Sequence, residues 1–178
     1  MATKPTYVDI ISEYYPEISV TAIDGYDYNS LVAGAGSVLP SKQDLDQKST
    51  YILRKSVWKE IQAMRDYRKS AGVKIDTNWF HSDDTSRIQQ LALTIMGANM
   101  PSNIMWKTMQ GTFVSMTPTL AMQIFQRIAG SDQAIYGRAE FHRQTMILSA
   151  EPENYNFMTG WTMTYEESPE HAALVDYQ

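Results

Sequence analysis

Residues 72–117, GVKIDTNWFHSDDTSRIQQLALTIMGANMPSNIMWKTMQGTFVSMT, decide the predicted fold, because strand, turn and helix signals follow one another there without a gap. Apolar and polar residues alternate over 73–75, and an aromatic run returns over 79–81. The intervening residues 76–78, Asp-Thr-Asn, are of the types that favour turns. The first part of the stretch therefore predicts a short β-hairpin.

The middle of the stretch predicts an amphipathic helix. Ser82 or Asp83 is placed to act as its N-cap, so we interpret Asp83–Asp84 as a cap rather than as part of a metal or acid–base site. Apolar residues recur there at helical spacing and form one stripe that we expect to face the core: Ile88, Leu91, Ala92, Ile95 and Met96. Leu93 lies off this stripe.

The last part of the stretch predicts a second hairpin. Its strands are expected over 104–108 and 112–116, and Gly111 is the residue able to take the positive φ that the turn requires. Thr117 then has the position of an N-cap, and Pro118 the first position of a helix. The stretch thus reads as hairpin, helix, hairpin, with a further helix after it.

Long helices are expected on both sides of this stretch. The first is predicted over 42–70, with a capping-box-like start and with Leu53, Val57, Ile61 and Met64 on one stripe. We interpret its basic end, residues 65–69, as a solvated face rather than an anion site, with cations that the helix dipole stabilises. The second helix is predicted from Pro118 to Leu148, and Gly130–Asp132 is a candidate kink or break in it.

The two ends of the chain carry smaller elements. Residues 7–15 are open to two interpretations, a short amphipathic helix or an extended start, and Pro16 ends either one. Period-2 alternation over 17–24, the turn formers Asp24 and Gly25, and a returning strand predict a hairpin unit over 16–36. A last short helix is expected to open at Ser168–Glu170 and to end at Asp176–Tyr177.

These elements together predict an α+β fold that is rich in helix. We expect two to three long helices with short β-hairpins between them and a small N-terminal β-hairpin unit. Three parts are predicted: residues 1–40 as the small N-terminal strand unit, 41–148 as a helical domain with two short hairpins, and 149–178 as an acidic, aromatic-rich C-terminal segment.

Composition excludes some classes of protein. The net charge of −5 argues against a general nucleic-acid binder, which usually carries a basic excess. Without cysteine there is no disulfide framework and no thiolate chemistry. The N-terminus lacks the pattern of a signal peptide, and no apolar run reaches the ~20 residues of a membrane span, so we expect no membrane partner.

The charge is concentrated at one end. No Lys or Arg follows Arg143, and residues 149–178 carry six acidic side chains: Glu151, Glu153, Glu166, Glu167, Glu170 and Asp176. The rest of the chain has 15 basic and 14 acidic residues, a net charge of +1. This contrast indicates either a solvated end or an interaction arm that docks on a basic partner, and the aromatic content favours the arm.

The sequence offers no arrangement typical of an enzyme. His81, His142 and His171 form no HxxxH pair, and no serine lies in a G-x-S-x-G elbow. Gly34-x-Gly36 lacks the remaining residues of a phosphate-binding loop and is better interpreted as part of a linker. We therefore predict a protein without catalytic activity, cofactor, metal ion or small-molecule substrate.

Three motifs, taken in order, resemble a domain of unknown function that is frequent in tail-region proteins of tailed bacteriophages. They are Arg65-Asp66-x-Arg68-x3-Gly72, Phe80-x2-Asp83-x2-Ser86, and Trp106-Lys-Thr108-x2-Gly111-x-Phe113-Val-x-Met-Thr117. This resemblance covers about residues 60–145. Tyr15-Pro16-Glu-Ile and Leu39-Pro40-Ser-Lys-x-x-Leu45-Asp46 are similar to the N-terminal part of small phage tail-region proteins. The resemblance does not extend to the acidic C-terminus.

The resemblance implies a protein of the phage tail region, which is made in the host cytoplasm and carried in the virion. Its implied partners are other tail or fibre proteins, or further copies of the chain. The first hypothesis is a structural component of the tail, baseplate or fibre. The second is a tail fibre assembly chaperone, and the third a glycan-binding module that uses exposed aromatics. The candidate interaction surface consists of Tyr51, Trp58, Tyr155, Phe157, Trp161 and Tyr165.

Overall fold

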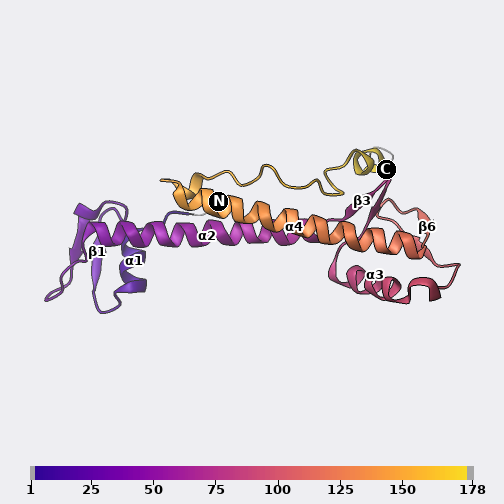
Figure 1. Ribbon diagram of the computed structural model, residues 1–178. Coiled ribbons are helices and arrows are strands. Elements are labelled where there is room, and N and C mark those ends of the chain that lie inside the picture. Colours follow the sequence, from indigo (N-terminus) through magenta and orange to yellow (C-terminus); the bar gives the residue numbers. More distant parts are fainter. Residues whose placement is uncertain (1–2, 176–178) are drawn as a thin grey trace. The chain divides into compact units, whose positions relative to one another are not determined.

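The computed structural model describes residues 3–175, which form two compact units (Figure 1). Unit 1 contains the chain up to Ile61 together with Arg143–Phe157. Unit 2 contains Gln62–His142 together with the chain from Met158 onward. The two longest helices, α2 (Lys42–Ser70) and α4 (Pro118–Leu148), each contribute residues to both units.

Unit 1 is organised around α1 (Tyr7–Tyr14), which settles the first residues as helical. Thr6 and Asp9 form a complete capping box at its start, and the helix ends immediately before Pro16, as expected. Ile10 and Ile11 are fully buried in a small core that also contains Leu31 and Leu45. Apolar burial on this face of α1 therefore holds the first element of the chain against the start of α2.

The predicted N-terminal hairpin is present, with a different connection. Strands β1 (Val20–Ala22) and β2 (Leu31–Ala33) pair antiparallel, with Val20 opposite Ala33. Asp24 and Gly25 do not form a two-residue turn between them. Residues 23–30 make a longer loop that contains the 3-10 turn η1 (Tyr28–Ser30), and the Ser30 hydroxyl donates to the Asp24 carbonyl at 2.6 Å. A 3-10 turn, η3 (Pro152–Asn154), follows α4 in the same unit.

Unit 2 contains the hairpin–helix–hairpin stretch that the sequence predicts. Strands β3 (Val73–Ile75) and β4 (Asn78–Phe80) pair with Val73 opposite Phe80, and Asp76 in the turn has a positive φ of 53°. Strands β5 (Met105–Lys107) and β6 (Phe113–Ser115) pair with Trp106 opposite Val114. Gly111 has a φ of 85° in the second turn, which confirms its expected role.

The long helices begin and end close to the predicted residues. At the start of α2 the Asp44 amide donates to the Ser41 hydroxyl at 3.1 Å, and at the start of α4 the Leu120 amide donates to the Thr117 hydroxyl at 3.1 Å. Gly130 does not interrupt α4, which is one helix of 31 residues. The described residues thus hold two long helices, the intermediate α3 (Asp84–Met96) with η2 (Gly97–Asn99) after it, and the short α1 and α5 (Pro169–Val175). The coarse prediction of a helix-rich α+β fold is confirmed. The predicted end of α5 at Asp176–Tyr177 lies outside the described residues.

The orientation of α3 differs from the sequence expectation. Asp83 caps the helix, as predicted, by accepting from the Ser86 amide at 3.0 Å. The buried residues of α3 are Gln90 and Leu93, which the apolar stripe did not include. The residues of that stripe are exposed on the opposite side of the helix: Ile88, Leu91, Ala92, Ile95 and Met96. The expectation that this stripe faces the core is therefore wrong.

Polar contacts explain the rotation of α3. Arg87 forms a bidentate ion pair with Asp132 of α4, at 2.6 and 2.9 Å, and also donates to the Lys69 carbonyl at 2.8 Å. One turn further, the Gln90 amide donates to the His81 carbonyl at 2.8 Å. Arg87 and Gln90 lie three residues apart on one face of α3. Their contacts turn that face toward the rest of unit 2 and leave the apolar stripe exposed.

Substitutions in α3 test this orientation. Leu93→Ala removes a side chain that is 8% exposed and should lower the free energy of unfolding by about 2–4 kcal/mol. Ile95→Ala, at a position that is 76% exposed, should change it by no more than about 0.5 kcal/mol. Urea unfolding followed by circular dichroism at low protein concentration measures both values. The opposite ranking would show that the apolar stripe faces the core after all.

Candidate interaction surfaces

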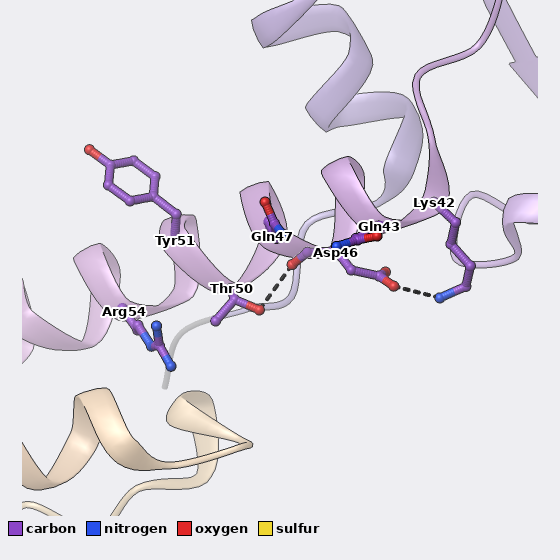
Figure 2. Close-up of a pocket in the computed structure, with 7 residues that line it drawn as sticks. All are labelled: Lys42, Gln43, Asp46, Gln47, Thr50, Tyr51 and Arg54. Atoms are coloured by element: carbon purple, nitrogen blue, oxygen red, sulfur yellow. Dashed lines mark hydrogen bonds and ion pairs between the residues drawn. The ribbon is translucent and has the colours of Figure 1, made fainter.

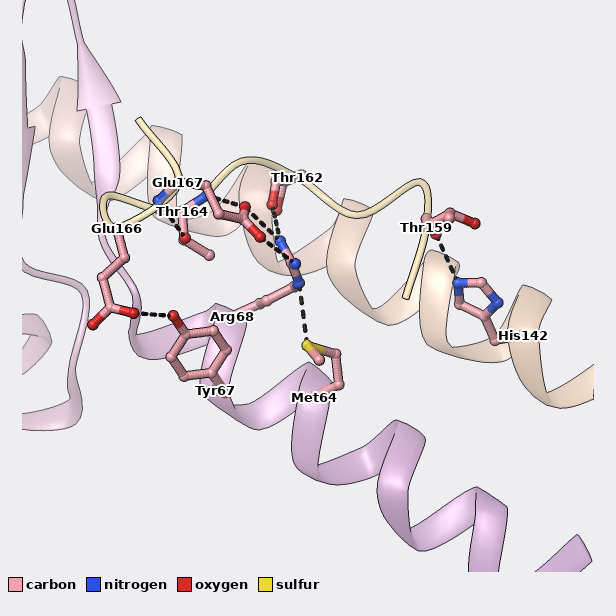
Figure 3. Close-up of polar contacts among 9 residues, drawn as sticks. All are labelled: Met64, Tyr67, Arg68, His142, Thr159, Thr162, Thr164, Glu166 and Glu167. Atoms are coloured by element: carbon pink, nitrogen blue, oxygen red, sulfur yellow. Dashed lines mark hydrogen bonds and ion pairs between the residues drawn. The ribbon is translucent and has the colours of Figure 1, made fainter. Parts of the chain in front are cut away.

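The C-terminal segment, residues 158–175, is held to the rest of unit 2 by a network around Arg68 (Figure 3). The Arg68 guanidinium donates to both carboxylate oxygens of Glu167, at 2.7 and 3.1 Å, and to the Thr162 carbonyl at 2.6 Å. Arg68 is only 7% exposed, so the expectation that the basic end of α2 is a solvated face is wrong for this residue. A nearly buried arginine with three such contacts fixes the segment in one place.

The other acidic side chains of the segment are paired as well. The Tyr67 hydroxyl donates to Glu166 at 2.6 Å. The Glu170 carboxylate accepts from the Lys74 ammonium and, at 3.3 Å, from the Trp79 indole nitrogen. The hydrogen bond from Lys74 lowers the pKa of Glu170 to about 2. The hydrogen bonds from Arg68 likewise hold the pKa of Glu167 below its ordinary value. The carboxylates are thus stabilised in their charged form by donors of the same unit.

Aromatic side chains add packing to this network. The Trp161 ring lies 5.3 Å from the His142 ring and 5.8 Å from the Arg68 guanidinium. His142 is fully buried, its Nε2 lies 3.0 Å from the Thr159 carbonyl, and burial lowers its pKa. Tyr165 is 8% exposed and packs against Trp79 at 5.9 Å. These rings are therefore packing groups within unit 2.

The structure gives a different account of the acidic end from the one that the sequence suggested. Glu166, Glu167 and Glu170, three of the acids expected in a docking arm, contact donors of unit 2. Glu151 accepts from the Asn154 side chain at 3.0 Å in unit 1. The expected arm is thus an internal strap over 158–175, and Asp176 lies outside the described residues.

The six aromatic residues proposed from the sequence as an interaction surface are divided between the units. Four of them belong to unit 1: Tyr51, Trp58, Tyr155 and Phe157. The other two, Trp161 and Tyr165, belong to unit 2. Tyr51 is exposed, whereas Trp58 is half-buried with the Arg143 guanidinium 5.2 Å from its ring. Tyr155, Phe157 and Trp161 are also half-buried, and Tyr165 is buried. Tyr51 is therefore the one that offers most of its ring to a partner.

Tyr51 borders an open groove on the N-terminal half of α2 (Figure 2). The groove has a volume of about 690 Å³ and is lined by polar residues that follow one another along the helix: Lys42, Gln43, Asp46, Gln47, Thr50, Tyr51 and Arg54. Lys42 and Asp46 form an ion pair at 2.6 Å, and the hydrogen bond from Lys42 lowers the pKa of Asp46. Residues from one helix face converge on no single point, so the groove lacks the geometry of a catalytic or cofactor site.

A second surface, which the sequence interpretation assigned to the core, lies on α3 and α4 of unit 2. Figure 1 shows α3 beside the N-terminal part of α4, and the Thr94 hydroxyl contacts the Ala121 carbonyl at 3.5 Å. Six large apolar side chains are 41% to 76% exposed there and define the α3/α4 surface: Ile88, Leu91, Ile95 and Met96 of α3, with Met122 and Phe125 of α4. Ile88, Leu91 and Phe125 together border a hollow of about 210 Å³.

The α3/α4 surface lies in a part of the chain that is almost without charge. Among residues 88–126 the only charged side chain is Lys107, in a protein in which 20% of the residues are charged. Protein interfaces have the same signature, depletion of charge with enrichment in Met and aromatic residues. This deficit was visible in the sequence and could have indicated an interface, whereas hydrophobic periodicity alone does not distinguish a core face from a docking face.

Residues 3–175 contain no group of three His, Asp or Glu side chains placed to hold a metal ion. Among the same residues no helix has the length and apolar character needed to cross a membrane.

The pKa of Glu167 can be measured at a single amide. The Thr164 amide donates to the Glu167 carboxylate at 3.0 Å, so its proton chemical shift should follow protonation of that group. We expect a titration midpoint below 4.5 in the protein and a higher midpoint in Arg68→Met. Because the folded-state pKa is depressed, the Arg68 contacts stabilise the segment fully above the unfolded value of about 4.3, and this stabilisation is lost as the pH falls through the folded pKa. A midpoint at or above 4.5 in the unmodified protein would contradict this assignment.

Truncation tests whether the C-terminal segment is an internal strap or a free arm. Ending the chain at Phe157 uncovers Trp79, which is 3% exposed, and leaves Arg68 without Glu167. The midpoint of thermal unfolding should fall by at least about 5 °C, from the combined loss of packing and charged hydrogen bonds. Glu166→Gln, which alters one exposed contact, is the control and should leave the midpoint nearly unchanged. An equally stable truncated protein would restore the free-arm interpretation.

Comparisons with known proteins identify a family and nothing narrower. No curated protein and no solved structure matches the chain. One family model matches residues 52–159, which include all of α3, the second hairpin and α4. The matched range covers more than half of the chain and contains the whole α3/α4 surface. On this basis the protein belongs to the family described as Domain of unknown function (DUF4376).

Proposed function

We propose that the chain is a non-enzymatic interaction protein of the tail region of a tailed bacteriophage, a structural component of the tail, baseplate or fibre of the virion. The observation that carries the proposal is the α3/α4 surface: six large apolar side chains, largely solvent-exposed, in a nearly uncharged part of the chain. The assignment to a phage tail is supported by the motif resemblance over about residues 60–145.

The size of the surface supports a role in protein–protein contact. If each large apolar residue presents about 200 Å² when fully exposed, the six residues together present on the order of 600 Å² of apolar surface to water. The largest patch on a typical monomer is about 300–600 Å² and is often functional. Burial of such a surface by a partner is favourable, at ~25 cal/mol per Å².

Two alternatives use different features of the chain. A tail fibre assembly chaperone would cover a fibre segment with the same apolar surface and then leave. It would therefore use the same site as a structural component, but the chain would not remain in the virion. A glycan-binding module would need exposed aromatic platforms. Trp79 is buried, and Trp161 is half-buried between Arg68 and His142. These two rings of unit 2 therefore offer little surface on which a sugar could stack.

Mass spectrometry of washed phage particles tests the proposal. The chain should be present in fixed proportion to the other tail proteins. The double variant Ile88→Glu, Ile95→Glu should be incorporated at least about tenfold less, because it places charges in a contact that excludes water. Ile23→Glu is the control, an added acid at a fully exposed position of unit 1, and should be incorporated normally.

The possible outcomes separate the hypotheses. Absence of the chain from particles whose assembly requires it would contradict the structural role and favour the chaperone. Normal incorporation of the double variant would contradict the role of the α3/α4 surface. Binding to a glycan array that is lost in Trp161→Ala would favour the glycan-binding module.

A further inference from the structure

We infer that the α3/α4 surface is covered by the same surface of a second copy of this chain, in a two-fold symmetric dimer. The inference rests on the proposed function, because it assigns an occupant to the surface that carries that proposal. Three observations support it: the spacing of the exposed side chains, the absence of charge, and the amount of apolar surface.

The exposed side chains have the spacing of a helix-packing interface. On α3, Ile88, Leu91 and Ile95 follow one another at intervals of three and four residues. On α4, Met122 and Phe125 are three residues apart, and the small Ala129 follows four residues later. Stripes with this spacing allow the side chains of one helix to fit between those of another at a shallow crossing angle. The surface thus presents two adjacent helices to a partner that is itself helical.

The surface contains both projecting side chains and a hollow. Ile88 and Ile95 are the most exposed members, at 69% and 76%. The hollow of about 210 Å³ is bordered by Ile88, Leu91 and Phe125, with the buried Gln90 and Ile128 beneath. A suitably placed two-fold axis brings each copy's projecting residues opposite the other copy's hollow, so one surface can be complementary to itself.

Charge favours a second copy over other occupants. In a two-fold contact a charged residue close to the axis meets its own copy, so the centre of such an interface is most favourable where it is neutral. The six side chains of the surface are uncharged, and Arg87, which also lines the hollow, is paired with Asp132. The whole chain carries −5, which makes other contacts between copies less favourable. A lipid surface would instead select a helix with free Lys or Arg on its polar face.

The apolar area is close to what a dimer needs. The six side chains present on the order of 600 Å² of apolar surface. This is most of the area, about 800 Å², that each partner buries in a standard interface. The polar side chains around the face, such as Gln89 and Gln126, would supply the rim. Together with this rim, the surface reaches the size of a standard interface.

Sedimentation of the purified full-length chain tests the inference. We expect a dimer at about 100 µM protein, with a Kd in the micromolar range or tighter. The double variant Ile88→Glu, Ile95→Glu should be a folded monomer, with association weakened at least about 100-fold, and circular dichroism checks its fold. Ile23→Glu adds a charge at a fully exposed position of unit 1 and should remain dimeric.

Disulfide trapping tests the same contact without a destabilising substitution. The chain contains no cysteine, so Leu91→Cys introduces a single thiol at the middle of the α3 stripe, where a two-fold axis would bring two copies together. Mild oxidation should yield a covalent dimer, and Ile23→Cys should yield none under the same conditions.

Each outcome is decisive. A monomer at about 100 µM that forms no Leu91→Cys dimer overturns the inference, as does a dimer that persists in the Glu variant or an oligomer of another order. A monomeric chain whose incorporation into particles still depends on Ile88 and Ile95 would leave the proposed function standing and identify a different protein as the occupant. If the chain is monomeric and its incorporation into particles does not depend on Ile88 and Ile95, both proposals are contradicted.

Discussion

The orientation of α3, and with it the surface that unit 2 presents, depends on Arg87. Its guanidinium joins the start of α3 to Asp132 of α4 and to the Lys69 carbonyl in the last turn of α2. The bidentate geometry fixes the angle of the helix as well as its position. The group is about one-quarter exposed, which screens the pair only in part and makes it more than a surface ion pair. The exposure of the apolar stripe of α3 follows from this orientation.

Local signals in the sequence were enough to predict most of the elements. Ser41, Asp83 and Thr117 act at helix starts as expected, and Gly111 takes the positive φ of its turn. These predictions succeed because a cap or a tight turn is decided by residues within four positions of one another. The β3–β4 and β5–β6 hairpins are predicted for the same reason.

The remaining features depend on residues that are far apart in the chain. The apolar stripe of α3 was assigned to the core because periodicity finds an apolar face without identifying what covers it. Asp132, whose ion pair with Arg87 orients α3, lies 45 residues after Arg87. The acidic end likewise looked like a free arm, since the partners of Glu167 and Glu170 lie at Arg68 and Lys74. Single-sequence reasoning has no means of pairing such distant charges.

The pairing of Arg68 with Glu167 also has a consequence for the order of folding. The two residues are 99 positions apart, so during synthesis Arg68 has no partner until Glu167 has been made. Trp79 likewise has to be followed by Glu170 before its hydrogen bond can form. At about 5–20 residues per second this delay is on the order of 5–20 s, far longer than helices and hairpins need to form. The helices and hairpins of unit 2 therefore exist well before its last contacts can close. The end of translation of this segment, rather than the intrinsic speed of folding, sets the time at which unit 2 is complete.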